Sequence, residues 1–106
     1  MEYEIVFSDA AKNDLFDIYY YVALNDSFFN ADKLKNRLIE KCSTLQKFPK
    51  RGHKIQEISE ERPDILQVVV TPYCIVYGID QNKVIIHAIL DGRRDLNSVL
   101  VNRLLD

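Results

Sequence analysis

The first half of the chain has a pattern that predicts one strand followed by two helices. Polar and apolar side chains alternate over residues 2–7, which is the period of a half-buried strand. Apolar positions then recur every three or four residues, predicting an amphipathic helix over residues 9–24 and a second one that ends at Phe48-Pro49. Ser8 and Ser27 stand where N-caps are expected. The short connection predicts an antiparallel helical hairpin.

The second half changes to the period of strands. Three apolar runs, residues 66–70, 73–79 and 84–90, are separated by short segments of turn-forming residues, which predicts antiparallel strands. Residues 95–105 are compatible with a short helix capped by Asp95 or with a tail that becomes ordered only on a partner. The order β-α-α-β-β-β with a short C-terminal helix predicts an α+β fold of two layers. The N-terminal strand and the helical hairpin would pack on an antiparallel sheet.

Length and composition favour one ordinary globular domain over residues 1–106. The chain has a mass of 12.4 kDa, with 47% hydrophobic and 28% charged residues. No apolar run approaches the roughly 20 residues of a membrane span, and the acidic start does not resemble a signal peptide. Cys42 and Cys74 are too few and too far apart for a zinc site or a disulfide framework. We therefore expect a cytoplasmic protein with reduced thiols and no metal or cofactor.

Charge is distributed unevenly along the chain, although the net charge is only -2. Residues 1–32 carry -6, residues 33–54 carry +7, residues 55–66 carry -3, and the remaining residues balance. One interpretation is that the basic segment binds an anionic partner. The other is that two neighbouring helices of opposite charge attract each other. Charge alone does not separate these interpretations.

Several segments, in this order and spacing, resemble the RelE/ParE superfamily of toxins from type II toxin–antitoxin modules. The patterns LxxFPxxG and YxIxYxI…I…GRRD are the most specific; the resembling segments are residues 8–11, 18–22, 45–52, 73–77 and 84–95. The resemblance implies an antitoxin partner and two possible targets. RelE-like members cut mRNA in the ribosomal A site, whereas ParE-like members inhibit DNA gyrase without catalytic residues of their own. Segments 18–22 and 92–95 resemble the ParE branch more closely.

An endoribonuclease would need a base, an acid and cations around the phosphate. His53 lies in the basic loop of residues 50–54 and is the candidate base, with a solvated loop residue as the simpler interpretation. His87 is spaced to face the same side of its strand as Ile85 and Ile89, which favours a hydrogen-bonded sheet histidine. The C-terminus lacks the Tyr or His that RelE-like nucleases often place there. These features weaken the nuclease interpretation.

Five basic residues are candidates for binding the target: Arg93, Arg94, Lys50, Arg51 and Lys54. An arginine pair can hold a carboxylate or phosphate in a bidentate manner. The alternative is that Arg94 pairs with Asp91 or Asp95 on the surface. The basic loop could contact a nucleic-acid backbone or an acidic antitoxin segment.

The chain has more aromatic side chains than one small core can hide. An antitoxin segment that is disordered until bound is expected to cover them, forming a hetero-oligomer. The candidates for this contact are Tyr19, Tyr20, Phe28, Phe29 and Tyr73.

Three functions therefore remain open. The favoured one is a ParE-like inhibitor of gyrase, and a pI near 5.6 suits a protein target better than ribosomal RNA. The second is a RelE-like, ribosome-dependent mRNA endoribonuclease. The third is a degenerate member that binds antitoxin without being toxic. It is motivated by Leu66, where the family commonly has an arginine that Arg62 could replace only if the loop bends back.

Overall fold

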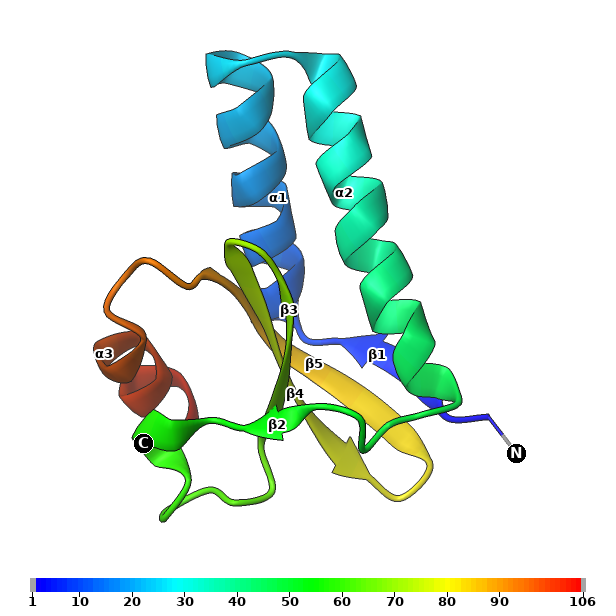
Figure 1. Cartoon of the computed structure of the whole chain (residues 1–106), viewed down its shortest axis with the longest axis vertical. Helices are drawn as coiled ribbons and strands as arrows, with labels where there is room; N and C mark the ends of the chain where they lie inside the picture. The colour runs from blue at the N-terminus through cyan, green and yellow to red at the C-terminus, as the bar shows by residue number, and fades with distance from the viewer. Residues whose placement is uncertain (1, 106) are drawn as a thin grey trace.

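The computed structural model describes residues 2–105, which form a five-stranded mixed sheet with helices on both faces (Figure 1). The strand order is β1-β5-β4-β3-β2, with β1 parallel to β5 and every other pair antiparallel. The main elements are β1 (Glu4–Phe7), α1 (Asp9–Asn25), α2 (Phe28–Ser43), β2 (His53–Lys54), β3 (Leu66–Val70), β4 (Tyr73–Asp80), β5 (Lys83–Asp91) and α3 (Leu96–Leu100).

The predicted α+β fold is confirmed, and the structure adds two features to the sheet. The three central strands are antiparallel neighbours as predicted, and the N-terminal strand joins them at the edge in parallel orientation. The two-residue strand β2 closes the other edge. No helix within residues 2–105 is long and apolar enough to cross a membrane.

The helical hairpin is capped as the sequence predicts. The Ser8 hydroxyl accepts a hydrogen bond from the Ala11 N–H at 3.1 Å, and the Ser27 hydroxyl accepts one from the Asn30 N–H at 3.0 Å. The second helix ends at Ser43, before the predicted stop at Phe48-Pro49. The chain there tightens into a 3₁₀ turn over Thr44–Gln46.

The hairpin covers one face of the sheet with only part of its length. Its buried contacts with the sheet come from side chains such as Ala11, Leu38 and Cys42, which pack against Tyr77 and Ile86. Figure 1 shows that the connected ends of α1 and α2 extend beyond the strands. Side chains near that end therefore have no sheet to pack against.

The opposite face of the sheet is covered by the segment before β3 and by the C-terminal segment. α3 begins at the predicted cap, because Asp95 accepts hydrogen bonds from the backbone and hydroxyl of Ser98. The segment of residues 95–105, for which a helix and a tail were both open, is therefore helical from Leu96 to Leu105. Its Leu100 is fully buried in a second cluster; the others buried there are Ile55, Ile58, Ile65, Val76, Ala88 and Leu90.

A β-bulge in β5 changes which face its later side chains occupy. Tyr77 pairs with Ile86 and Val76 pairs with Ala88, so His87 is the extra residue. After the bulge, Ile89 packs on the hairpin side while Ala88 packs on the opposite face. A Cβ atom at Gly78 would lie 3.2 Å from His87 Nε2 and 3.3 Å from Ile65 Cδ1, so His87 lies on the face away from the hairpin. The expectation that His87 faces the same side as Ile89 is therefore wrong, because it assumed unbroken alternation.

His87 is half-buried on the side away from the hairpin, and this gives a prediction about pH. Burial, with the Arg62 charge as a smaller contribution, lowers the pKa of His87 below its ordinary 6.5. The unfolded chain therefore takes up the proton at higher pH than the folded chain. We expect the free energy of unfolding to decrease as the pH falls below about 6.5.

Urea unfolding at about pH 7.5 and about pH 5.5 tests this expectation. His87→Gln should lose less stability between the two conditions than the unmodified chain. His53→Gln is the matched control, because it removes the other histidine of the chain, which is exposed on β2. The assignment to His87 is contradicted if all three chains respond equally.

The phenol of Tyr77 explains the spacing of the Phe48-Pro49 and Gly52 motif. Its hydroxyl donates to the Pro49 carbonyl at 2.7 Å and accepts from the Gly52 N–H at 3.0 Å. A Cβ atom at position 52 would lie 2.5 Å from that hydroxyl oxygen and 2.7 Å from the Gln67 carbonyl oxygen. Glycine is therefore required by the close approach of the loop to β4.

Candidate functional site

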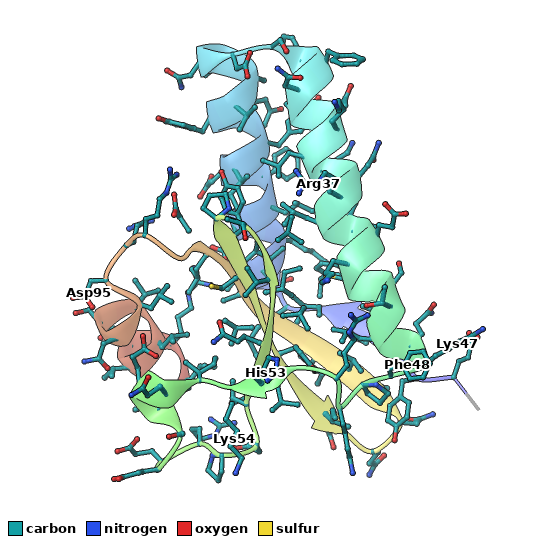
Figure 2. The ribbon with its side chains drawn as sticks, in the orientation of Figure 1. Arg37, Lys47, Phe48, His53, Lys54 and Asp95 are labelled. Atoms are coloured by element: carbon teal, nitrogen blue, oxygen red, sulfur yellow. The ribbon has the colours of Figure 1, made fainter. Side chains whose placement is uncertain are left out.

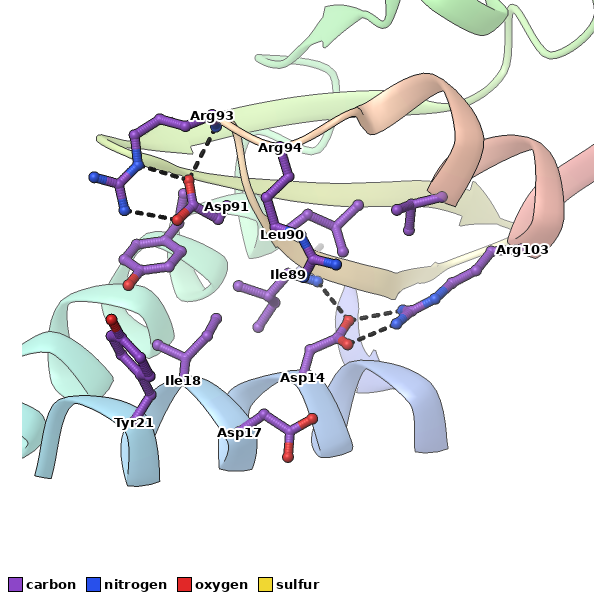
Figure 3. A pocket seen from close by; sticks show the side chains of 12 residues that line it. Asp14, Asp17, Ile18, Tyr21, Ile89, Leu90, Asp91, Arg93, Arg94 and Arg103 are labelled. Atoms are coloured by element: carbon purple, nitrogen blue, oxygen red, sulfur yellow. Dashed lines mark hydrogen bonds and ion pairs between the residues drawn. The ribbon is translucent and has the colours of Figure 1, made fainter. Parts of the chain in front are cut away.

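A cleft of about 480 Å³ lies between α1, the facing ends of β4 and β5, and the C-terminal segment (Figure 3). We call it the arginine cleft, because three arginines line it. Its charged lining consists of Asp14, Asp17, Asp91, Arg93, Arg94 and Arg103, and its apolar or aromatic lining consists of Ile18, Tyr21, Tyr73, Ile89, Leu90 and Val99.

Asp14 joins the three parts of the chain that form this cleft. It receives two hydrogen bonds from the Arg103 guanidinium, both at 2.7 Å, and one from the Ile89 N–H at 2.9 Å. Ile89 follows directly after the bulge region, where strand pairing is disturbed. Asp14 thus holds β5 and the C-terminal segment against α1. Asp14 and Arg103 are 89 positions apart, so no sequence spacing pointed to their pairing.

Arg93 and Arg94 have different environments. The Arg93 guanidinium donates two hydrogen bonds to Asp91, at 2.9 and 2.7 Å, and these lower the pKa of Asp91 to about 2. Arg94 forms no ion pair within residues 2–105, and its side chain points into the cleft in Figure 3. The alternative that Arg94 pairs with Asp91 or Asp95 is therefore wrong. Asp91 holds Arg93, and Asp95 caps α3.

The other predicted target-binding residues lie away from the arginine cleft. Lys50 and Arg51 line a shallow groove near Tyr3, next to the loop that the Tyr77 phenol holds. Lys54 is exposed on β2, at the opposite edge of the sheet from β1. The structure thus separates the single predicted target set into the cleft and a distant basic surface.

The structure does not assemble a catalytic group around His53. His53 is exposed on β2, and its backbone pairs with Gln67. Within the described part of the chain, no side-chain hydrogen bond or ion pair joins His53 to an acid or base. Arg62 does not replace the arginine missing at Leu66. It bonds to Asp64 and to the Leu104 carbonyl at 2.8 Å instead.

Large aromatic and aliphatic side chains are exposed on both helices of the hairpin. We call Phe16, Tyr20, Leu24, Phe28 and Phe29 the hairpin patch; all five are between 50% and 80% exposed. The first three occupy successive turns of α1, and the Phe16 and Tyr20 rings stack at 5.4 Å.

Three of the five residues predicted to bind antitoxin belong to this hairpin patch. Of the others, Tyr19 is half-buried and donates a hydrogen bond to Asp32 at 2.9 Å. Tyr73 lies in the arginine cleft with Tyr21. The sequence prediction missed Phe16 and Leu24, which the four-residue spacing from Tyr20 could have identified.

Comparisons with known proteins agree on the type of fold. The family model described as "ParE toxin of type II toxin-antitoxin system, parDE" matches residues 5–96. A solved structure described as "Chromosomal ParDE TA system from P. aeruginosa" is similar with a TM-score of 0.70 and 18% sequence identity. The match covers 83% of this chain and 94% of the other. No curated protein matches the chain. The family match extends over β1 to the start of α3.

Proposed function

Because the chain belongs to the ParE toxin family of type II toxin–antitoxin systems, we propose that it inhibits DNA gyrase in the cytoplasm. The inhibition is by binding, and a cognate antitoxin neutralises the chain. The resemblance to the ParE branch supports gyrase as the target. The observation that carries the proposal is that Arg94 lines the arginine cleft and forms no ion pair with any residue of the described chain.

The cleft combines features of a protein-recognition site. A guanidinium can hold a carboxylate with two parallel hydrogen bonds, and Arg94 forms no ion pair with a carboxylate of residues 2–105 that would first have to be displaced. Ile18, Tyr21 and Tyr73 supply apolar and aromatic surface beside it. Arginine and tyrosine surrounded by apolar contacts are typical of residues that dominate interface energies. We therefore place an acidic side chain of gyrase at Arg94.

Pulse labelling in bacteria separates this function from the alternatives. The chain is expressed without antitoxin, and the synthesis of DNA and protein is followed separately. Gyrase inhibition requires DNA synthesis to fall first, with filamentation and an SOS response. If protein synthesis falls first, the ribosome is the target. If growth continues, the chain is a degenerate member that retains only antitoxin binding.

The hairpin patch is the proposed antitoxin site, and Phe29→Asp tests it. A charge on this exposed apolar surface should weaken antitoxin binding by roughly 10- to 100-fold, because the carboxylate loses water on contact. Phe29 is 71% exposed, so the fold should not change. Phe48→Asp is the matched control, since Phe48 is 65% exposed and lies outside the patch. Titration calorimetry that gives the two variants the same affinity would remove the patch from this role.

A further inference from the structure

The bases of residues 33–54 are not neutralised by the acidic helix beside them. No ion pair joins α1 to α2 in the described residues, and the α1 acid that does form one, Asp14, pairs with Arg103. Lys33 and Lys35 lie over the rings of Phe29 and Tyr19 instead. The interpretation of two helices joined by opposite charges thus lacks direct contacts.

The remaining bases lie on α2, on the segment after it and on β2, and we call them the basic band. It consists of Arg37, Lys41, Lys47, Lys50, Arg51 and Lys54, with Glu40 as its acid and a net charge of +5. Five of the six bases are exposed, and Lys41 is half-buried. None forms an ion pair with any residue between 2 and 105.

Two hollows make the basic band accessible to a long partner. Arg37 and Lys41 line one of about 460 Å³ beside the β3–β4 turn, and Lys47, Lys50 and Arg51 line the groove of about 710 Å³. Figure 2 shows the labelled members of the band placed from the middle of α2 down to β2. The band therefore extends over several elements and is not confined to one point.

We propose that the basic band binds the phosphate backbone of DNA. A regular polyanion presents a charge to each cation of an extended row, and the release of its condensed counterions drives binding. An acidic peptide would have to order itself to match the same row. Four of the seven acids of residues 1–32 lie on β1 and α1, and one of the seven, Asp32, lies on α2, so the net charge of -2 conceals an excess of bases on α2 and the segment after it. This binding is separate from gyrase recognition at the arginine cleft.

Fluorescence anisotropy with a labelled DNA duplex of about 20 base pairs tests the proposal on the full chain. We expect a dissociation constant on the order of 10–100 μM near 0.1 M salt, with affinity falling steeply as salt rises. Lys47→Gln combined with Lys50→Gln should weaken binding about 10-fold. It should also reduce the slope of log affinity against log salt by about two.

The matched control removes the same charge elsewhere. Lys12 and Lys83 are exposed outside the basic band, so Lys12→Gln combined with Lys83→Gln should leave binding nearly unchanged. Equal losses in the two double variants, or no binding near 0.05 M salt, would overturn the proposal. The proposal would also be overturned if polyglutamate displaces the labelled duplex better than unlabelled duplex does, because the partner would then be an acidic protein segment. The assay contains no gyrase, so its outcome is independent of the proposed target.

Discussion

Arg94→Glu is expected to raise the dissociation constant of the chain for gyrase by about 100-fold and to remove growth arrest. The substitution replaces the cation proposed to hold a carboxylate of the target with a second carboxylate. Attraction thereby becomes repulsion at the interface with the target. Because Arg94 forms no ion pair in residues 2–105, the free energy of unfolding should change little. Surface plasmon resonance with immobilised gyrase measures the affinity.

Two further variants make the Arg94 result specific. Lys83→Glu reverses an exposed charge at the beginning of β5, far along the strand from the cleft, and should bind gyrase as the unmodified chain does. Arg94→Lys keeps the charge but loses the planar fork, so it should show an intermediate loss. Unchanged binding by Arg94→Glu, or an equal loss in Lys83→Glu, would show that Arg94 does not contact the target.

Asp14→Ala is expected to lower the free energy of unfolding by roughly 2–3 kcal/mol. The change removes the acceptor of the Ile89 N–H and of two Arg103 hydrogen bonds, and Arg103 keeps the 3.5 Å hydrogen bond to the His87 carbonyl. The Asp14 side chain is only 11% exposed, whereas that of Arg103 is 29% exposed, and this partial contact with water keeps the cost moderate. Urea unfolding measures the loss.

Asp17→Ala is the control for Asp14→Ala, because Asp17 lies one turn further along α1. Asp17 forms no ion pair in the described chain and is exposed, so its loss should change stability by less than about 0.5 kcal/mol. Hydrogen exchange adds a local readout. The Ile89 amide should exchange faster in Asp14→Ala and at the original rate in Asp17→Ala. Equal stability of both variants would contradict the linking role of Asp14.

The local features of the fold were predictable because they depend on neighbouring residues. Ser8 and Ser27 cap helices through backbone groups three positions away, and the β3 and β4 segments are apolar runs separated by a short turn. The parallel edge position of β1 was not predictable, since it depends on how the hairpin returns the chain to the sheet. The β-bulge at His87 inserts one residue into a regular apolar run, so the pattern gave no sign of it.

The candidate site was predictable only in part, because contacts between distant positions create it. Arg94 was identified from its motif. That it forms no ion pair in residues 2–105 depends on Asp91 binding Arg93 instead. The Asp14–Arg103 pair joins residues 89 positions apart, so local spacing carries no signal for it. The hairpin patch follows from helical spacing. Its exposure follows from the length of the hairpin relative to the sheet.

Direct action of the chain on gyrase is tested by a reaction with purified components. The purified chain is added to gyrase, ATP and relaxed plasmid, and both supercoiling and DNA cleavage are measured on gels. Direct action predicts that supercoiling falls as the chain is added, that cleaved plasmid accumulates in complex with gyrase, and that antitoxin reverses both effects. Normal supercoiling with no trapped cleavage, at concentrations that arrest growth, would contradict it.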